Sequence, residues 1–145
     1  MRHFLLFLFL MSSCSLLFSQ VTIKGVAPAY IGETIEAFKI LDYFSNKEER
    51  IASTTVEKDS MFTLYIESNF TQKIIIKSKN NKGFLLIQPN GKYEISFPEK
   101  DKFSPNRPNG NLVEIAFYNL DSMDINYKVL GFQRWVDHFL GNNYH

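Results

Sequence analysis

Residues 61–67 read Met-Phe-Thr-Leu-Tyr-Ile-Glu, and their pattern indicates the fold class. Phe62, Leu64 and Ile66 alternate with more polar side chains, which is the two-residue period of a strand with one buried face. The same alternation recurs in residues 92–97, which read Lys-Tyr-Glu-Ile-Ser-Phe. A helix would instead place apolar residues three or four positions apart. Both segments are therefore predicted to be β-strands.

Five further segments complete a predicted set of seven short strands, namely 21–26, 33–44, 51–57, 74–76 and 84–87. The segments 74–76 and 84–87 are continuous apolar runs, as expected of central strands. Asn90-Gly91 is a turn signal, because this pair accepts positive φ at little cost. Short strands with no helical segments between them are typical of a β-sandwich or a small barrel. We predict a mainly β fold, a seven- to eight-stranded antiparallel β-sandwich followed by a C-terminal α-helix.

The composition excludes several classes of function. The chain has 145 residues, 45% hydrophobic and 21% charged, which is typical of a globular protein. It has 16 basic and 15 acidic residues, and removing Arg2 with the predicted leader leaves 15 of each. A neutral chain gives no electrostatic reason to expect a nucleic-acid partner or an anionic membrane surface. Its single cysteine, Cys14, rules out an internal disulfide and a Cys-based zinc site.

Residues 1–19 are predicted to be a removable signal peptide, with a short basic start, an apolar run at 4–10 and a small-residue end. The run is too short and too interrupted to span a bilayer, so no membrane span is expected in the mature chain. Cleavage before Gln20 would give a periplasmic, cell-envelope or secreted protein. Alternatively, Cys14 ends a degenerate lipobox and carries a lipid. The apolar residues 15–18 would then form the tether, which should be polar, so ordinary cleavage is favoured.

The mature chain divides into three predicted regions. Residues 20–98 form the sandwich, and residues 99–111 form a linker or long surface loop rich in Pro and Asn. Residues 112–145 add a final strand at 112–118 and an amphipathic helix. This last region is either the start of a further region in a longer protein or the end of a small domain whose helix covers its own core.

The predicted helix carries an apolar stripe. Asp121 is expected to cap its start, with Asp124 completing a capping box, and Gly141 is expected to end it. The stripe comprises Ile125, Val129, Phe132, Val136, Phe139 and Leu140, with Trp135 at its edge. This surface either packs on the sheet or faces a partner. Phe132, Trp135 and Phe139 are the candidate partner-facing residues.

No residue is assigned a catalytic, cofactor-binding or metal-binding role. His138 and His145 are seven residues apart and could share a helix face, but Gly141 is expected to end the helix between them. The aspartates at 121 and 124 are explained by helix capping and the helix dipole. The chain has no Gly-x-Ser-x-Gly motif and no glycine-rich phosphate loop. We therefore predict that the protein is not an enzyme and uses no cofactor.

Aromatic residues suggest a second kind of partner. The aromatic side chains that could form a flat platform for stacking sugars are Tyr30, Tyr43, Tyr65, Tyr118 and Trp135. The alternative, which is favoured, is that these rings are ordinary core residues and cross-strand pairs.

Three segments together resemble a known family. They are Val21–Gly25, the Thr-rich Thr54–Val56 before the turn at 59–62, and Phe84–Tyr93. The chain resembles, over about residues 21–97, the N-terminal β-sandwich domain of unknown function in exported Bacteroidetes proteins, which often precedes a thioredoxin-like domain. Ser60 replaces the glycine usual in the family's Asp-Gly-x-Phe turn. The resemblance implies an envelope location and an accessory role, and it transfers no site residues.

The expected function is therefore a non-catalytic exported module that contacts a protein or positions a following domain in the cell envelope. One alternative is a carbohydrate-binding module that uses exposed aromatic rings. A second alternative is the N-terminal accessory segment of a larger envelope enzyme.

Overall fold

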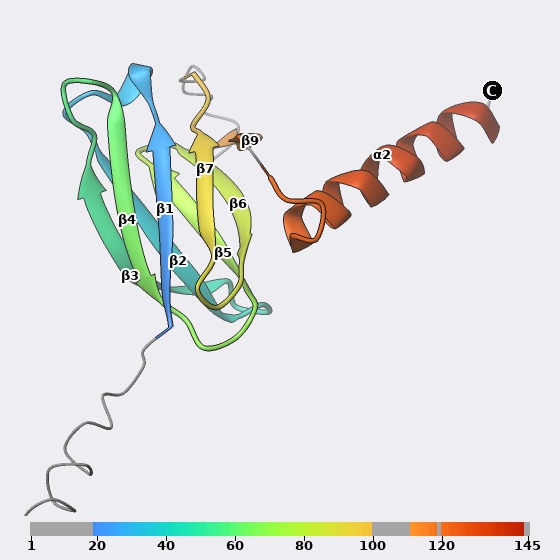
Figure 1. Ribbon diagram of the computed structural model, residues 1–145, viewed down its shortest axis with the longest axis horizontal. Coiled ribbons are helices and arrows are strands. Elements are labelled where there is room, and N and C mark those ends of the chain that lie inside the picture. The colour runs from blue at the N-terminus through green and yellow to red at the C-terminus, as the bar shows by residue number, and fades with distance from the viewer. Residues whose placement is uncertain (1–18, 100–110, 119, 144–145) are drawn as a thin grey trace, which may run out of the picture.

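The computed structural model of the protein describes residues 19–99, 111–118 and 120–143. Two β-sheets pack face to face, and one long helix projects from them (Figure 1). The fold is thus the predicted β-sandwich with a C-terminal helix. Cys14, with the rest of the leader up to residue 18, and residues 100–110 of the predicted loop lie outside the described residues.

The elements of the sandwich follow one another with short connections. The strands are β1 (Gln20–Val26), β2 (Thr34–Asp42), β3 (Lys47–Thr55), β4 (Met61–Glu67), β5 (Gln72–Ser78), β6 (Asn81–Ile87), β7 (Lys92–Ser96), β8 (Asn111–Leu112) and β9 (Ala116–Tyr118). A short 3-10 helix, η1 (Pro28–Tyr30), follows β1, and the long helix is α2 (Ile125–Asn143). The seven strands predicted between residues 21 and 97 are all present as β1 to β7, although β3 begins at Lys47 and not at Ile51.

The pairing of the strands is mixed. One sheet has the order β4-β1-β7-β9 and the other has the order β3-β2-β5-β6-β8. Neighbouring strands pair antiparallel except β1 with β7 and β6 with β8, which are parallel. The prediction of a wholly antiparallel sandwich is therefore wrong at these two pairs. Both pairs join strands that are distant in the sequence, so no hairpin turn fixes their direction.

The predicted final strand at 112–118 is divided between the two sheets. β8 pairs with the edge of β6, whereas β9 pairs with β7 in the opposite sheet. Val113 and Ile115, which lie between them, are buried and close the open side of the core. The apolar alternation predicts one continuous strand, but this segment instead crosses from one sheet to the other.

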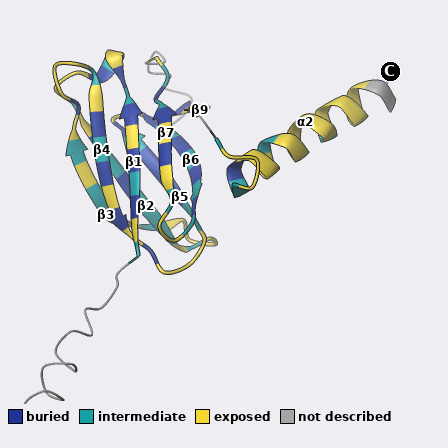
Figure 2. Cartoon of the chain, viewed as in Figure 1, coloured by how far each residue is buried: buried dark blue, intermediate teal, exposed yellow. Residues whose placement is uncertain are grey.

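The core is made by the inward faces of the strands. In β1, Val21 and Ile23 point inward and lie opposite Ile66 and Leu64 of β4. Burial alternates along the strands, as the dark and light bands of Figure 2 show. None of the described residues of α2 belongs to this core. The sandwich therefore buries its own apolar faces without covering them with the helix.

Ser60 adopts a left-handed backbone conformation at the β3–β4 turn, with φ of 71°. This conformation costs a residue with a Cβ about 1 kcal/mol and costs glycine little. We expect Ser60→Gly to raise the free energy of unfolding by about 1 kcal/mol, as measured by chemical denaturation. Ser53→Gly, in the middle of β3, is the matched control and should lower it. An unchanged or reduced stability of Ser60→Gly would contradict the expectation.

The boundaries of α2 differ from the prediction at both ends. Asp124, and not Asp121, caps the helix, because its Oδ1 accepts the Asn126 N–H at 2.7 Å. Asp121 instead holds the preceding turn, where its Oδ1 accepts the Met123 N–H at 2.8 Å. Gly141 lies within the helix and does not end it. Glycine often ends a helix by adopting a positive φ, but Gly141 does not adopt one. Among the described glycines, only Gly32 has a positive φ.

Helix α2 leaves the sandwich near β6 and β9, and its C-terminal end lies far from both sheets (Figure 1). Of the two alternatives left open for this helix, the one in which it covers its own core does not hold for the described residues, because none of α2 belongs to the core. In the part of the chain that the structure describes, no helix is both long enough and apolar enough to cross a membrane.

Candidate functional site

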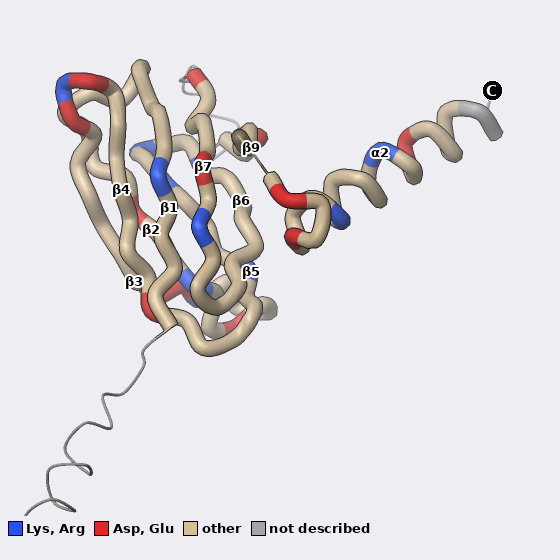
Figure 3. The backbone as a smooth tube through the Cα atoms, in the orientation of Figure 1, with Lys and Arg blue, Asp and Glu red and all other residues tan. Residues whose placement is uncertain are grey.

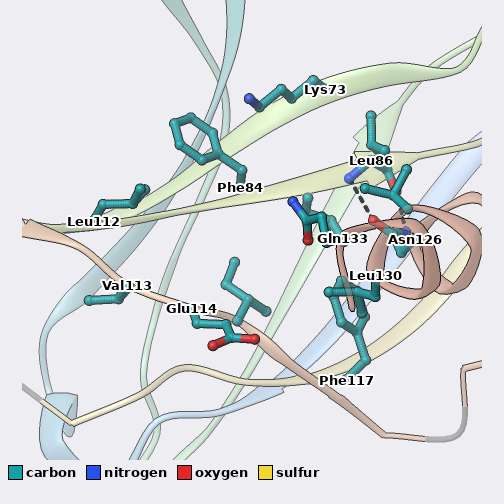
Figure 4. Close-up of a pocket in the computed structure, with 13 residues that line it drawn as sticks. Lys73, Phe84, Leu86, Leu112, Val113, Glu114, Phe117, Asn126, Leu130 and Gln133 are labelled. Atoms are coloured by element: carbon teal, nitrogen blue, oxygen red, sulfur yellow. Dashed lines mark hydrogen bonds between the residues drawn. The ribbon is translucent and has the colours of Figure 1, made fainter. Parts of the chain in front are cut away.

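Asn126 attaches the first turn of α2 to the edge of β6. Its Nδ2 donates to the Leu86 carbonyl oxygen at 2.7 Å, and its Oδ1 accepts the Leu86 N–H at 2.9 Å. The side chain thus makes the two hydrogen bonds that a neighbouring strand would make at this position (Figure 4). Asn126 is only 5% exposed. The amide therefore closes a sheet edge that the two-residue strand β8 leaves open.

A cavity of about 480 Å³ lies beside this contact. Its walls come from β6, the crossing segment between β8 and β9, and the first turns of α2. Leu86, Val113, Phe117 and Leu130 supply apolar surface, and Gln133 supplies a polar group from the helix (Figure 4). The arrangement offers apolar contact at the junction of helix and sandwich.

A second cavity, of about 620 Å³, lies on the outer face of the five-stranded sheet. Four lysines and one glutamate line it, among other residues. The Lys73 Nζ lies 3.9 Å from the centre of the Phe84 ring, and the Lys77 Nζ lies 4.7 Å from that of Phe38. Lys77 also forms an ion pair with Glu48. Lys73 and Phe84 line both cavities, so the two form adjacent parts of one surface.

An aromatic row runs along the outer part of α2. It consists of Phe132, Trp135 and Phe139, which are 63%, 60% and 48% exposed. The rings of Phe132 and Trp135 are 5.9 Å apart with planes inclined by 25°, and those of Trp135 and Phe139 are 5.5 Å apart and inclined by 18°. Few charged residues lie along this helix (Figure 3). We call these three residues the aromatic row.

The other residues considered from the sequence do not gather in one place. Tyr30 is fully buried, where its ring meets Phe97 edge to face at 5.0 Å and its hydroxyl accepts the Asn81 Nδ2–H. The exposed Tyr65 and Tyr118 lie on β4 and β9, which are the two opposite edges of one sheet. The exposed Tyr43 lies in the turn between β2 and β3, and Trp135 lies on α2, so the exposed rings of this set occupy separate elements.

The pKa values of Asp42 and Tyr93 are shifted, and these two groups belong to turns or packing. The Ser45 hydroxyl and the Phe44 N–H, which donate hydrogen bonds to the Asp42 carboxylate, hold its pKa below the usual range. Burial raises the pKa of the Tyr93 hydroxyl, which accepts the Gln88 N–H. Neither residue lines the two cavities. Among the described residues, no group of three His, Cys, Asp or Glu side chains could hold a metal ion.

Sequence reasoning found the aromatic row but missed Asn126 and the lysine-lined face. The signal for Asn126 was a polar residue one position into an apolar helical stripe. The signal for the lysines was the alternation at Lys73-Ile-Ile-Ile-Lys77, in which the outward residues are Lys73, Ile75 and Lys77. Compared with protein-family models and with curated proteins, the chain matches none of them.

Proposed function

We propose that the protein is a non-catalytic module, exported to the cell envelope by its leader, that contacts another protein chain through helix α2. The aromatic row carries this proposal. Aromatic side chains dominate the binding energy of protein interfaces, and Trp is among the residues most enriched at their energetic centres. The leader at 1–19 supports the exported location.

The aromatic row leaves apolar surface in contact with water, which costs free energy unless another molecule covers it. A single exposed apolar side chain is ordinary, whereas a contiguous group of large ones marks an interaction surface. The row cannot be explained as part of the core, because the sandwich buries its own faces. The three rings also pack on one another, which fixes their side-chain conformations before binding and lowers the entropy lost on contact.

The projection of α2 supports a second candidate role, that of a spacer. A helix of 19 residues is about 28 Å long at the usual rise per residue. It would hold a following domain at that distance from the sandwich, in the manner of an accessory segment. The two roles are compatible, since a spacer helix can also present a contact surface.

Photo-cross-linking tests the contact. We expect a photoreactive phenylalanine derivative at position 132 to give a discrete cross-linked species when the protein is irradiated in the producing cells. The same derivative at Tyr127, an exposed position on the other side of the same helix, should give none. Equal yields from the two positions, or no cross-linked species from position 132, would contradict the proposal.

Fractionation of the producing cells tests the location. We expect the protein in the envelope fraction or the medium, with Gln20 at its N-terminus by mass spectrometry. A lipid-modified Cys14 at the N-terminus would show that the protein is a lipoprotein and that cleavage before Gln20 does not occur. Protein that keeps its leader in the cytoplasm would contradict the exported location.

A further inference from the structure

The apolar stripe of α2 has the spacing of a helix that packs against another helix. Val129, Phe132, Val136 and Phe139 follow one another at intervals of three, four and three residues. This is the a and d pattern of a heptad, which places apolar side chains along one narrow seam. A flat sheet surface sets no such requirement on the spacing. The expected occupant of the seam is therefore an α-helix.

The seam is complementary to itself when two copies run antiparallel. In that register, Val129 faces the partner's Phe139, and Phe132 faces the partner's Val136. Each layer then combines a large side chain with a small one, which fills the space between helices without overpacking. The Trp135 rings of the two copies lie along the same flank, close to the two-fold axis.

The charges of α2 favour the same direction. Lys128 lies seven residues before Trp135 and so shares its flank of the seam, whereas Arg134 lies nearly opposite Phe132. The last turn of α2 contains no basic residue to offset the negative end of the helix dipole. An antiparallel partner brings its Lys128 to this end. A parallel partner would leave the C-terminal ends of both helices without a basic residue.

The attachment of the helix also favours an antiparallel pair. The sandwich joins α2 at its N-terminal end and the helix projects away from it (Figure 1). Two antiparallel copies keep their sandwiches at opposite ends of the helix pair. Two parallel copies would place both sandwiches side by side at the same end.

We infer that the partner of α2 is the α2 helix of a second copy of this chain, bound antiparallel through the seam and the aromatic row. The inference rests on the proposed function and specifies its partner. The side chains of the seam and the aromatic row are Val129, Phe132, Trp135, Val136 and Phe139. In two copies their exposed parts amount to about 1,000 Å², which is the size of a weak, reversible interface. We therefore expect a monomer–dimer equilibrium in the micromolar range.

Sedimentation equilibrium of the purified protein tests the dimer. We expect the mass to rise from one chain to two with concentration, while the emission of the single tryptophan shifts to shorter wavelength as Trp135 becomes buried. Phe132→Ser should weaken the dimer at least tenfold. Tyr127→Ser, the matched control on the opposite side of the helix, should change the dissociation constant less than twofold. A monomer at all concentrations, or equal effects of the two variants, would overturn the inference.

A charge substitution tests the direction of the pair. Lys128→Gln should weaken an antiparallel dimer about fivefold at low salt, because the interaction with the dipole is lost at both ends. Arg134→Gln, outside the seam, should leave the dissociation constant unchanged. An unchanged or tighter dimer on Lys128→Gln would overturn the proposed antiparallel arrangement.

The mass of the species cross-linked from position 132 separates this inference from the proposed function. A species of twice the chain mass supports both. A species of any other mass overturns the second copy as partner and leaves the contact through α2 standing. The absence of a cross-linked species overturns both.

Discussion

Replacing Gly25 with alanine is expected to lower the free energy of unfolding by about 3 kcal/mol. Gly25 lies in β1 directly opposite Phe62 of β4, and the Phe62 ring covers it. A Cβ at position 25 would lie 2.0 Å from the Phe62 Cζ and 2.2 Å from its Cε1. The ring cannot move away easily, because Phe62 is itself buried in the core.

Chemical denaturation of a double-mutant cycle tests the expectation. Phe62→Leu removes the ring, so Gly25→Ala should cost less in the Phe62→Leu background than in the native one. Gly131→Ala is the matched control, because a Cβ at position 131 meets nothing within 4 Å. That exposed helical substitution should raise stability by about 1 kcal/mol. A Gly25→Ala protein as stable as the native one would show that the ring does not occupy this position.

Replacing Asn126 with alanine is expected to cost about 2 kcal/mol and to loosen α2 from the sandwich. The substitution leaves the Leu86 N–H and carbonyl oxygen without the partners that lie 2.9 and 2.7 Å away. These groups lie at a partly buried strand edge, where a missing hydrogen bond is incompletely replaced by water.

Hydrogen exchange locates this effect. The amide of Leu86 should exchange faster in Asn126→Ala, whereas the amides of β1 and β4 should change only by the global loss of stability. Gln133→Ala is the matched control, since Gln133 lines the same cavity about two turns further along the helix. Unchanged protection of Leu86 in Asn126→Ala would mean that the side chain does not close this edge.

The candidate site was only partly predictable from the sequence. The apolar stripe of α2, including Phe132 and Trp135, follows from spacing alone, because side chains three and four residues apart share a helix face. The spacing does not say what that face meets. The stripe could equally have covered a sheet. Whether it does so depends on whether the two sheets already bury each other's apolar faces.

The lysine-lined outer face shows the same limit. The outward positions of β5 and β6 can be assigned from alternation, but alternation does not say which side chains meet. Lys77 meets Phe38 and Glu48, which come from β2 and β3, far away in the sequence. Lys73 meets Phe84 only because β5 and β6 pair in a register that sets Ile75 opposite Phe84. A shift of one residue would turn these side chains to the other face of the sheet.

Periodicity alone predicted the seven strands from 21 to 97 and the existence of an amphipathic helix, because it is a local property of the chain. Three features could be seen only in the folded chain: the parallel pairs β1·β7 and β6·β8, the division of residues 112–118 between two sheets, and the role of Asn126. These features depend on which strand edges remain open once the sheets have packed. Which edges remain open depends in turn on contacts between distant residues, and no local pattern in the sequence records those contacts.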